Sequence, residues 1–274
     1  MMSPSSRYTA TIALFVALGG FLMGFDASVI SGVVGFIEVE FSLTKIQVGW
    51  SVSSLALTAT LAMMLSGPLS DRIGRRPVLR IAATLFAISA IASALAPSFY
   101  WLVVARMLGG LGVGAALIIA PMYIAEMAPP ESRGRLVSFN QLNIVIGISV
   151  AVFSNYLILS LGESGGAGSE ALRLGEWTWR WMLGVETLPA VLYLFALLFV
   201  PESPRWLAMR GRDDEAIAVL ERVGGRDLAA DEIREIKEAI EAEREPVSYT
   251  HLRAHETTSL IAYAVFCLKR GGGG

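Results

Sequence analysis

The stretch Gly67-Pro-Leu-Ser-Asp-Arg-Ile-Gly-Arg-Arg76 decides the predicted fold. It joins two long apolar runs, 56–67 and 78–96, through a short turn that is rich in arginine. Arginine and lysine resist transfer across a membrane, so a basic turn between two membrane helices marks the side that stays in the cytoplasm. The stretch therefore predicts a membrane hairpin. A basic loop that only fixes topology is the alternative reading of such a turn.

The composition also indicates a membrane protein. Hydrophobic residues make up 54% of the chain and charged residues only 17%, against about 25% in soluble domains. The net charge of −2 gives no indication of nucleic-acid binding, and the single cysteine, Cys267, excludes an intrachain disulfide. We find no metal-ligand spacing, phosphate-binding loop or nucleophile–base pair, so we expect neither a cofactor nor an enzyme.

Six apolar runs are long enough to cross a hydrocarbon core, which requires about 20 residues each. They are 10–36, 47–67, 78–96, 100–127, 136–161 and 177–200. The first run lacks a cleavage signal and is expected to be retained. Basic residues concentrate in alternate connections, which places both termini in the cytoplasm of a multi-pass protein of the cell (plasma or inner) membrane.

The chain divides into three parts by composition. Residues 1–202 form the predicted six-span transmembrane bundle. Residues 203–245 are rich in charge, with apolar residues at helical spacing, and predict short amphipathic helices on the cytoplasmic face. Residues 246–274 resemble a translated adaptor segment and end in four glycines, so we expect them to be foreign to the protein.

Two ionisable residues lie inside predicted spans. Asp26 is in the first span and Arg106 in the fourth. A charge at mid-membrane costs roughly 2.5–3.5 kcal/mol on insertion scales, so it usually faces a partner or a cavity. One hypothesis is a static ion pair that fixes packing. The other is a proton site, in which movement of Arg106 loads and unloads Asp26.

A cluster of amide side chains occurs in the fifth predicted span, at Asn140, Gln141 and Asn143. Amides both donate and accept hydrogen bonds, which suits a ligand rich in hydroxyl groups. Hydrogen bonding between helices is an equally good interpretation for the two asparagines. For Gln141 we favour a ligand contact.

The chain resembles the sugar porter family of the major facilitator superfamily. The likeness rests on five segments of the sequence. They are Gly24-Phe-Asp-Ala-Ser-Val-Ile-Ser-Gly32, Asp71-Arg-Ile-Gly-Arg-Arg76, Pro121-Met-Tyr-Ile-Ala-Glu126 with Arg133-Gly134, Val137-Ser-Phe-Asn-Gln141 and Pro201-Glu-Ser-Pro-Arg-Trp-Leu207. The resemblance implies an all-α membrane protein, the six-helix amino-terminal bundle of the major facilitator fold with short cytoplasmic helices.

The resemblance also implies roles for single residues. Asp26 matches the proton acceptor of proton-coupled members, and Arg106 matches its partner arginine. Gln141 matches a glutamine that hydrogen-bonds the sugar, and Ile144 and Ile148 would line the same pocket.

A second set of residues matches the charge network by which the two halves of such carriers are latched. Its members are Gly67, Asp71, Arg72, Gly74, Arg75, Arg76, Glu126, Arg133, Glu202 and Arg205.

The resemblance implies proton-coupled transport of a hexose or pentose by alternating access, with a sugar, a proton and the lipid bilayer as partners. Family members have twelve spans, so we expect a truncated carrier that lacks its carboxy-terminal six-helix bundle. A facilitative sugar or polyol carrier is the first alternative. A sugar-binding receptor that does not transport is the second.

Overall fold

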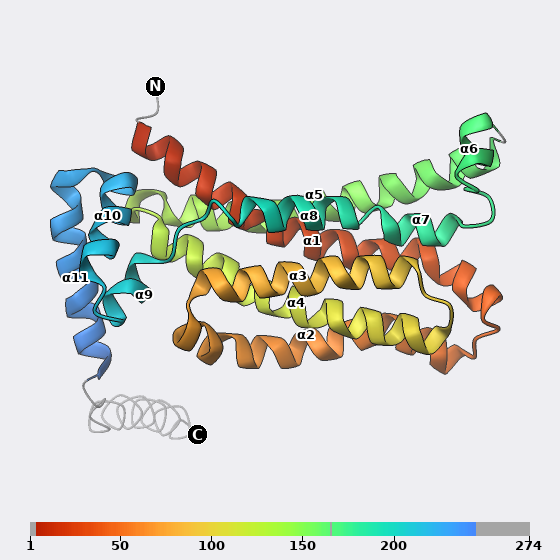
Figure 1. Ribbon diagram of the computed structural model, residues 1–274, viewed down its shortest axis with the longest axis horizontal. Helices are drawn as coiled ribbons and strands as arrows, with labels where there is room; N and C mark the ends of the chain where they lie inside the picture. Colours follow the sequence, from red (N-terminus) through yellow and green to blue (C-terminus); the bar gives the residue numbers. More distant parts are fainter. Residues whose placement is uncertain (1–3, 165, 245–274) are drawn as a thin grey trace, which may run out of the picture. The chain divides into compact units, whose positions relative to one another are not determined.

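The computed structural model describes residues 4–164 and 166–244, and the predicted foreign segment, 246–274, lies outside them. The described residues form helices joined by short turns, without strands. Five helices are long: α1 (Pro4–Glu40), α2 (Lys45–Ile73), α3 (Arg75–Ala94), α4 (Phe99–Met127) and α5 (Pro130–Glu163). They run up and down, and consecutive helices meet at alternate ends of the bundle (Figure 1). The first five predicted spans are thereby confirmed as helices.

Local sequence explains where these helices begin. Thr44 caps α2 through a reciprocal pair of hydrogen bonds with Gln47, which is the capping box expected of such a spacing. Ser98 accepts a hydrogen bond from the amide of Trp101 at the start of α4. Pro130 is the first residue of α5, where a missing N–H costs nothing. These caps satisfy amides that a helix cannot satisfy internally.

The sixth predicted span is present as two helices in succession. They are α7 (Thr178–Gly184) and α8 (Thr187–Ala196), separated by a break at Val185 and Glu186. A short helix, α6 (Ala167–Ala171), precedes them. The predicted amphipathic helices follow as α9 (Pro204–Met209), α10 (Asp213–Gly224) and α11 (Arg226–Arg244).

Helix α1 lies at the centre of the bundle and packs against α4, α5, α7 and α8. Its buried stripe includes Phe25, Val29 and Val33, which join Trp179 and Leu183 of α7 in one apolar cluster. Helix α4 packs against both α2 and α3. The bundle is therefore built around two inner helices, α1 and α4, and both carry the predicted intramembrane charges.

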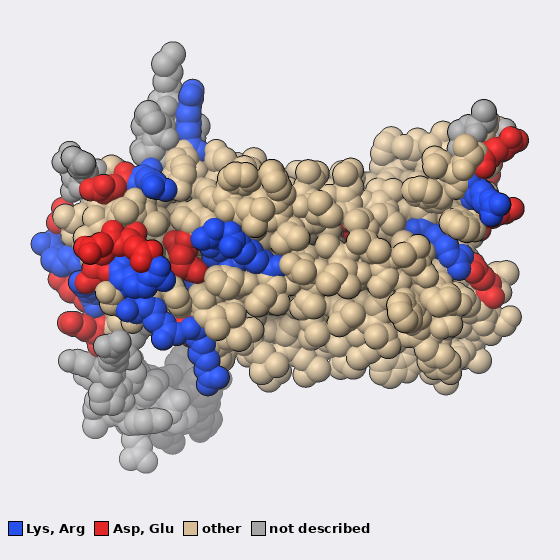
Figure 2. Space-filling view, in the orientation of Figure 1, with Lys and Arg blue, Asp and Glu red and all other residues tan. Residues whose placement is uncertain are grey.

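Charged side chains gather at the two ends of the bundle, and the surface between them is almost free of charge (Figure 2). Five helices of the described residues are long and apolar enough to cross a membrane. Of these, α2 and α5 are the least buried, so each presents a broad apolar surface. An uncharged belt between two charged ends is what a bilayer requires.

Two compact units are distinguished within the chain, one up to Ile233 and one from Arg234 onward. The first contains the membrane helices together with α9, α10 and the beginning of α11. Of the second unit, the structure describes the last turns of α11, where Arg234 and Glu238 form an exposed ion pair.

Candidate functional site

Asp26 and Arg106 are in contact in the middle of the bundle. One guanidinium nitrogen of Arg106 lies 3.2 Å from Oδ1 of Asp26, and its Nε donates to the backbone carbonyl of Ser51 at 3.0 Å. The two residues are only 3% and 2% exposed. Three helices, α1, α2 and α4, thus meet at one buried ion pair, and neither charge faces lipid.

Glycines allow the helices to approach closely enough for this contact. A Cβ at Gly110 or Gly114 of α4 would collide with the backbone of α2, at the carbonyls of Leu55 and Ala59. A Cβ at Gly24 of α1 would collide with the backbone of Ile144 on α5. Close approach of this kind is the usual role of small residues between membrane helices.

A third ionisable residue, Glu186, belongs to the same buried cluster. It lies in the break between α7 and α8 and is 2% exposed. Its carboxyl group interacts electrostatically with both Asp26 and Arg106. Sequence analysis did not identify Glu186, although an acid inside an apolar run carries the same signal that singled out Asp26. The cluster therefore holds two carboxyl groups for one guanidinium.

Parts of this cluster have no hydrogen-bond partner among the described residues. Oδ2 of Asp26 and Oε1 of Glu186 are both buried and unpaired. Buried polar groups are usually satisfied, so two unpaired carboxyl oxygens set this cluster apart from ordinary helix packing.

The second site lies at the end of the bundle that contains the α2–α3 turn. Arg75 is buried and binds Glu126 of α4 through two nitrogens, at 3.1 and 3.2 Å. It also contacts the carboxylate of Asp71 at 3.0 Å and the carbonyl of Ser70 at 3.3 Å. A two-pronged guanidinium–carboxylate pair is a strong and directional contact, so it fixes the turn against α4.

Glu202 completes this site from the segment after α8. Its Oε1 accepts hydrogen bonds from the backbone amides of Arg75 at 3.0 Å and Arg76 at 3.1 Å. The carboxylate thus caps the first turn of α3, where negative charge is favourable. Gly74, the residue before α3, has a φ of 105°, a conformation that residues other than glycine rarely adopt.

Several side chains bind backbone carbonyls around the same site. Tyr123 of α4 donates to the carbonyl of Pro201 at 2.9 Å, and Trp206 of α9 donates to that of Asp71 at 3.0 Å. Arg80 of α3 donates to the carbonyls of Leu197 and Leu198 at the end of α8. The segment between α8 and α9 is therefore held by α3 and α4, and α9 itself is held by α2.

The structure brings together Asp71, Gly74, Arg75, Arg76, Glu126 and Glu202 of the predicted charge network. For the remaining members of the network, the structure gives a backbone contact or the degree of exposure. The backbone of Arg72 accepts a hydrogen bond from Arg210, while Arg133 is exposed on α5 and Arg205 is half-buried in α9. Gly67 has open space beside its Cα.

The amide cluster of α5 is divided between two faces of the helix. Asn140 is buried, and its carbonyl groups lie against Gly20 of α1, so it belongs to the α1–α5 packing seam. Gln141 and Ile148 are exposed, and Ile144 is half-buried at the edge between the two faces. This division favours the packing interpretation for Asn140 and leaves Gln141 free to contact a ligand.

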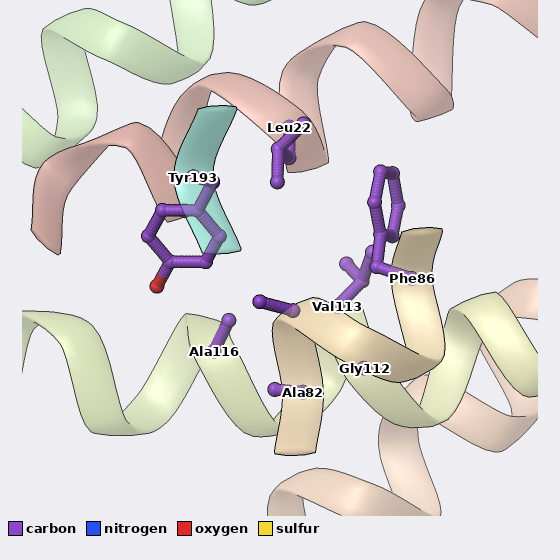
Figure 3. A pocket seen from close by; sticks show the side chains of 9 residues that line it. Leu22, Ala82, Phe86, Gly112, Val113, Ala116 and Tyr193 are labelled. Atoms are coloured by element: carbon purple, nitrogen blue, oxygen red, sulfur yellow. The ribbon is translucent and has the colours of Figure 1, made fainter. Parts of the chain in front are cut away.

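A small cavity lies between α1, α3, α4 and α8 (Figure 3). Its volume is about 10 Å³, and Leu22, Phe86, Val113 and Tyr193 are among the residues that line it. A single water molecule needs about this much room, so the cavity is far too small for a sugar.

Comparison with known proteins identifies the family. Residues 12–268 match the family described as "Sugar (and other) transporter". The chain belongs to this sugar transporter family. The match runs past residue 245 and so does not stop at the predicted foreign segment.

Two curated relatives of this sugar transporter chain are symporters by name. The arabinose-proton symporter of Bacillus subtilis (strain 168) is 40% identical over 242 residues, which are 88% of this chain and 51% of the relative. The D-xylose-proton symporter of Escherichia coli (strain K12) is 36% identical over 263 residues, 86% of this chain and 52% of the relative. The chain thus spans about half the length of these relatives.

A solved structure of the major facilitator superfamily proton:xylose symporter XylE, bound to 6-bromo-6-deoxy-D-glucose, matches with a TM-score of 0.81 and 36% identity. The match covers 91% of this chain and 57% of that chain. The predicted fold class, a helical bundle of the major facilitator fold, is confirmed, and the family consists of transporters.

Proposed function

We propose that this chain forms the amino-terminal half of a proton-coupled sugar symporter of the cell membrane. The observation that carries the proposal is the buried cluster of Asp26, Glu186 and Arg106, with two carboxyl groups sharing one guanidinium. Ionised carboxyl groups at such a place repel each other, so one proton on the pair balances the charge of the cluster. The names of the arabinose and xylose symporters among the relatives support the same coupling.

In this mechanism the proton binds at the carboxyl pair and changes how tightly Arg106 is held by Asp26. Arg106 is anchored on α2 through the carbonyl of Ser51, so weakening its bond to Asp26 loosens α1 relative to α2 and α4. Alternating access then arises from rocking of this bundle against a second six-helix half, as in other secondary transporters.

Sugar is proposed to bind on the exposed face of α5, where Gln141 offers an amide to sugar hydroxyl groups. Ile144 and Ile148 flank it on the same side of the helix. The sugar is a pentose or hexose: the two symporter relatives are named for pentoses, arabinose and xylose, and the XylE structure is bound to a derivative of glucose.

The network around Arg75, Glu126 and Glu202 is proposed to lie on the cytoplasmic side, because basic residues concentrate there. Helix α1 begins at this end as well (Figure 1). Arg133 is exposed and available to a second half.

The experiment is a fusion of residues 1–244 to the second half of the Bacillus subtilis arabinose-proton symporter. Uptake of labelled arabinose, xylose and glucose is measured in vesicles with and without an inward proton gradient. We expect gradient-driven accumulation of at least one sugar, and loss of that accumulation in Asp26→Asn with sugar exchange retained. Sugar uptake that is the same with and without the proton gradient favours a facilitative carrier. Sugar binding without uptake favours a receptor.

A further inference from the structure

A polar contact fastens α1 to α7 at the end of the bundle opposite the α2–α3 turn. Glu40, the last residue of α1, accepts a hydrogen bond from the indole nitrogen of Trp179 and a second, at 2.9 Å, from Arg180. Arg180 also donates to the carbonyl of Ala96, between α3 and α4. We call this set of contacts the Glu40 tie.

The Glu40 tie combines an exposed and a buried component. The side chains of Glu40 and Arg180 are 37% and 22% exposed, and an ion pair of that exposure contributes little alone. Trp179, however, is 2% exposed, and the guanidinium of Arg180 lies 4.2 Å from the centre of its ring. Without Glu40 the indole N–H becomes a buried donor without a partner, which a folded protein avoids.

Helix α7 depends on such an anchor more than the other spans do. It has seven residues, and no side chain caps its first turn. Trp179 and Arg180 lie in that first turn, so the Glu40 tie holds the helix at its beginning. Leu183, one turn later, packs into the apolar cluster with Val33 and Ile37 of α1.

Glu186 follows Arg180 by six residues and lies two residues after the end of α7. Its buried carboxyl group interacts electrostatically with Asp26 of α1 and Arg106 of α4. Helices α1 and α7 are thus joined by polar groups at two levels, the Glu40 tie and the buried carboxyl pair. A shift of α7 along α1 changes both at once.

We propose that Glu40 is a positioning residue, which sets the register of α7 on α1 and thereby the position of Glu186 beside Asp26 and Arg106. The proposal deepens the proposed proton coupling and rests on it for its biological meaning. Glu40 itself touches neither proton nor sugar in this scheme.

The test reads the environment of Glu186 without requiring transport. The full chain is purified in detergent and treated with an apolar carbodiimide, which modifies protonated carboxyl groups, over a range of pH. The fraction of Glu186 modified is measured by mass spectrometry. The variants are Glu40→Ala, Trp179→Phe, which keeps a ring but removes the donor, and Glu40→Asp as the conservative change.

The matched control is Glu38→Ala. Glu38 lies two residues before Glu40 at the end of α1 and pairs with the exposed Lys45. The substitution therefore removes an acid from the same helix end and leaves the contacts of Glu40 with α7 in place. Asp26→Asn is the positive control, because it changes a direct neighbour of Glu186.

We expect Glu40→Ala and Trp179→Phe to move the pH of half-modification of Glu186 by about half a unit or more, about a threefold change in the protonation equilibrium. Glu40→Asp should move it less and Glu38→Ala not at all. A profile that is unchanged in Glu40→Ala while Asp26→Asn shifts it overturns the proposal. Because the assay needs neither sugar nor a second half, a failure of proton-coupled transport in the fusion is a separate result.

Discussion

The carboxylate of Glu202 is bonded to the backbone amide of Arg75 at 3.0 Å, across 127 residues of sequence. The same oxygen accepts from the next amide, so a residue of the segment after α8 caps the first turn of α3. The side chain of Arg75 meanwhile binds Glu126 of α4. One short turn is thereby joined to two distant segments, by its backbone on one side and by its side chain on the other.

Glu202→Ala should lower the free energy of unfolding of the purified chain by about 1–2 kcal/mol, because two amides of α3 lose their acceptor. Unfolding is followed by circular dichroism during denaturant titration in mixed micelles. Glu215→Ala is the control, since the ion pair of Glu215 with Arg212 is exposed to solvent. Equal stability of the two variants would show that the cap contributes nothing.

The two glycines that begin and divide the 67–76 stretch should respond differently to alanine. Gly74→Ala is strained by its φ of 105° and by contact with the carboxylate of Glu202, so we expect a loss of about 1–3 kcal/mol. Gly67→Ala meets open space inside α2 and should be neutral or stabilising by up to about 1 kcal/mol. Thermal unfolding of the two variants measures the difference in stability between them. Equal stability of the two variants would contradict the prediction.

Gly147→Ala should weaken the seam between α1 and α5. A Cβ at this position would collide with the carbonyl of Phe21 and touch the amide of Phe25, and backbone cannot move as a flexible side chain can. We expect a loss of about 1–3 kcal/mol in the same unfolding assay. Gly134→Ala, on the same helix but with open space around it, should cost far less. A similar loss of stability in both variants would show that the effect comes from alanine within α5 and not from the contact between α1 and α5.

Glu186→Gln should abolish gradient-driven sugar accumulation in the fusion, as we also expect for Asp26→Asn, because the remaining acid then balances Arg106 without an exchangeable proton. The substitution keeps the size of the side chain, so folding should be retained. Vesicle uptake and counterflow exchange are measured together. Normal accumulation in Glu186→Gln would remove this residue from the coupling mechanism and leave Asp26 as its acid.

Gln141→Ala should weaken sugar binding about twofold to tenfold, corresponding to about 0.5–1.5 kcal/mol for one lost hydrogen bond. Its exposed position means that stability should not change. Equilibrium binding of labelled sugar to the fusion gives the affinity, and Gln47→Ala, in the cap of α2, controls for surface amides. An unaltered affinity would exclude Gln141 from the site.

Much of this protein was predictable from sequence because a membrane imposes simple rules. Runs of about 20 apolar residues must become helices to satisfy their backbone in lipid, so the first five spans were predicted correctly. Asp26 and Arg106 were found because charge in such a run is costly. Glu186 carried the same signal and was overlooked among the apolar residues of 177–200.

What only the tertiary structure decided is which groups meet. Periodicity places Asn140 and Gln141 on one helix but cannot say that α1 covers the first and leaves the second exposed. No local rule predicts that Glu202 caps a helix 127 residues earlier, or that the sixth span breaks at Glu186, whose carboxyl group interacts electrostatically with Asp26. The sequence determined the helices and the cost of their charges, whereas the contacts that offset that cost depend on how separate helices pack.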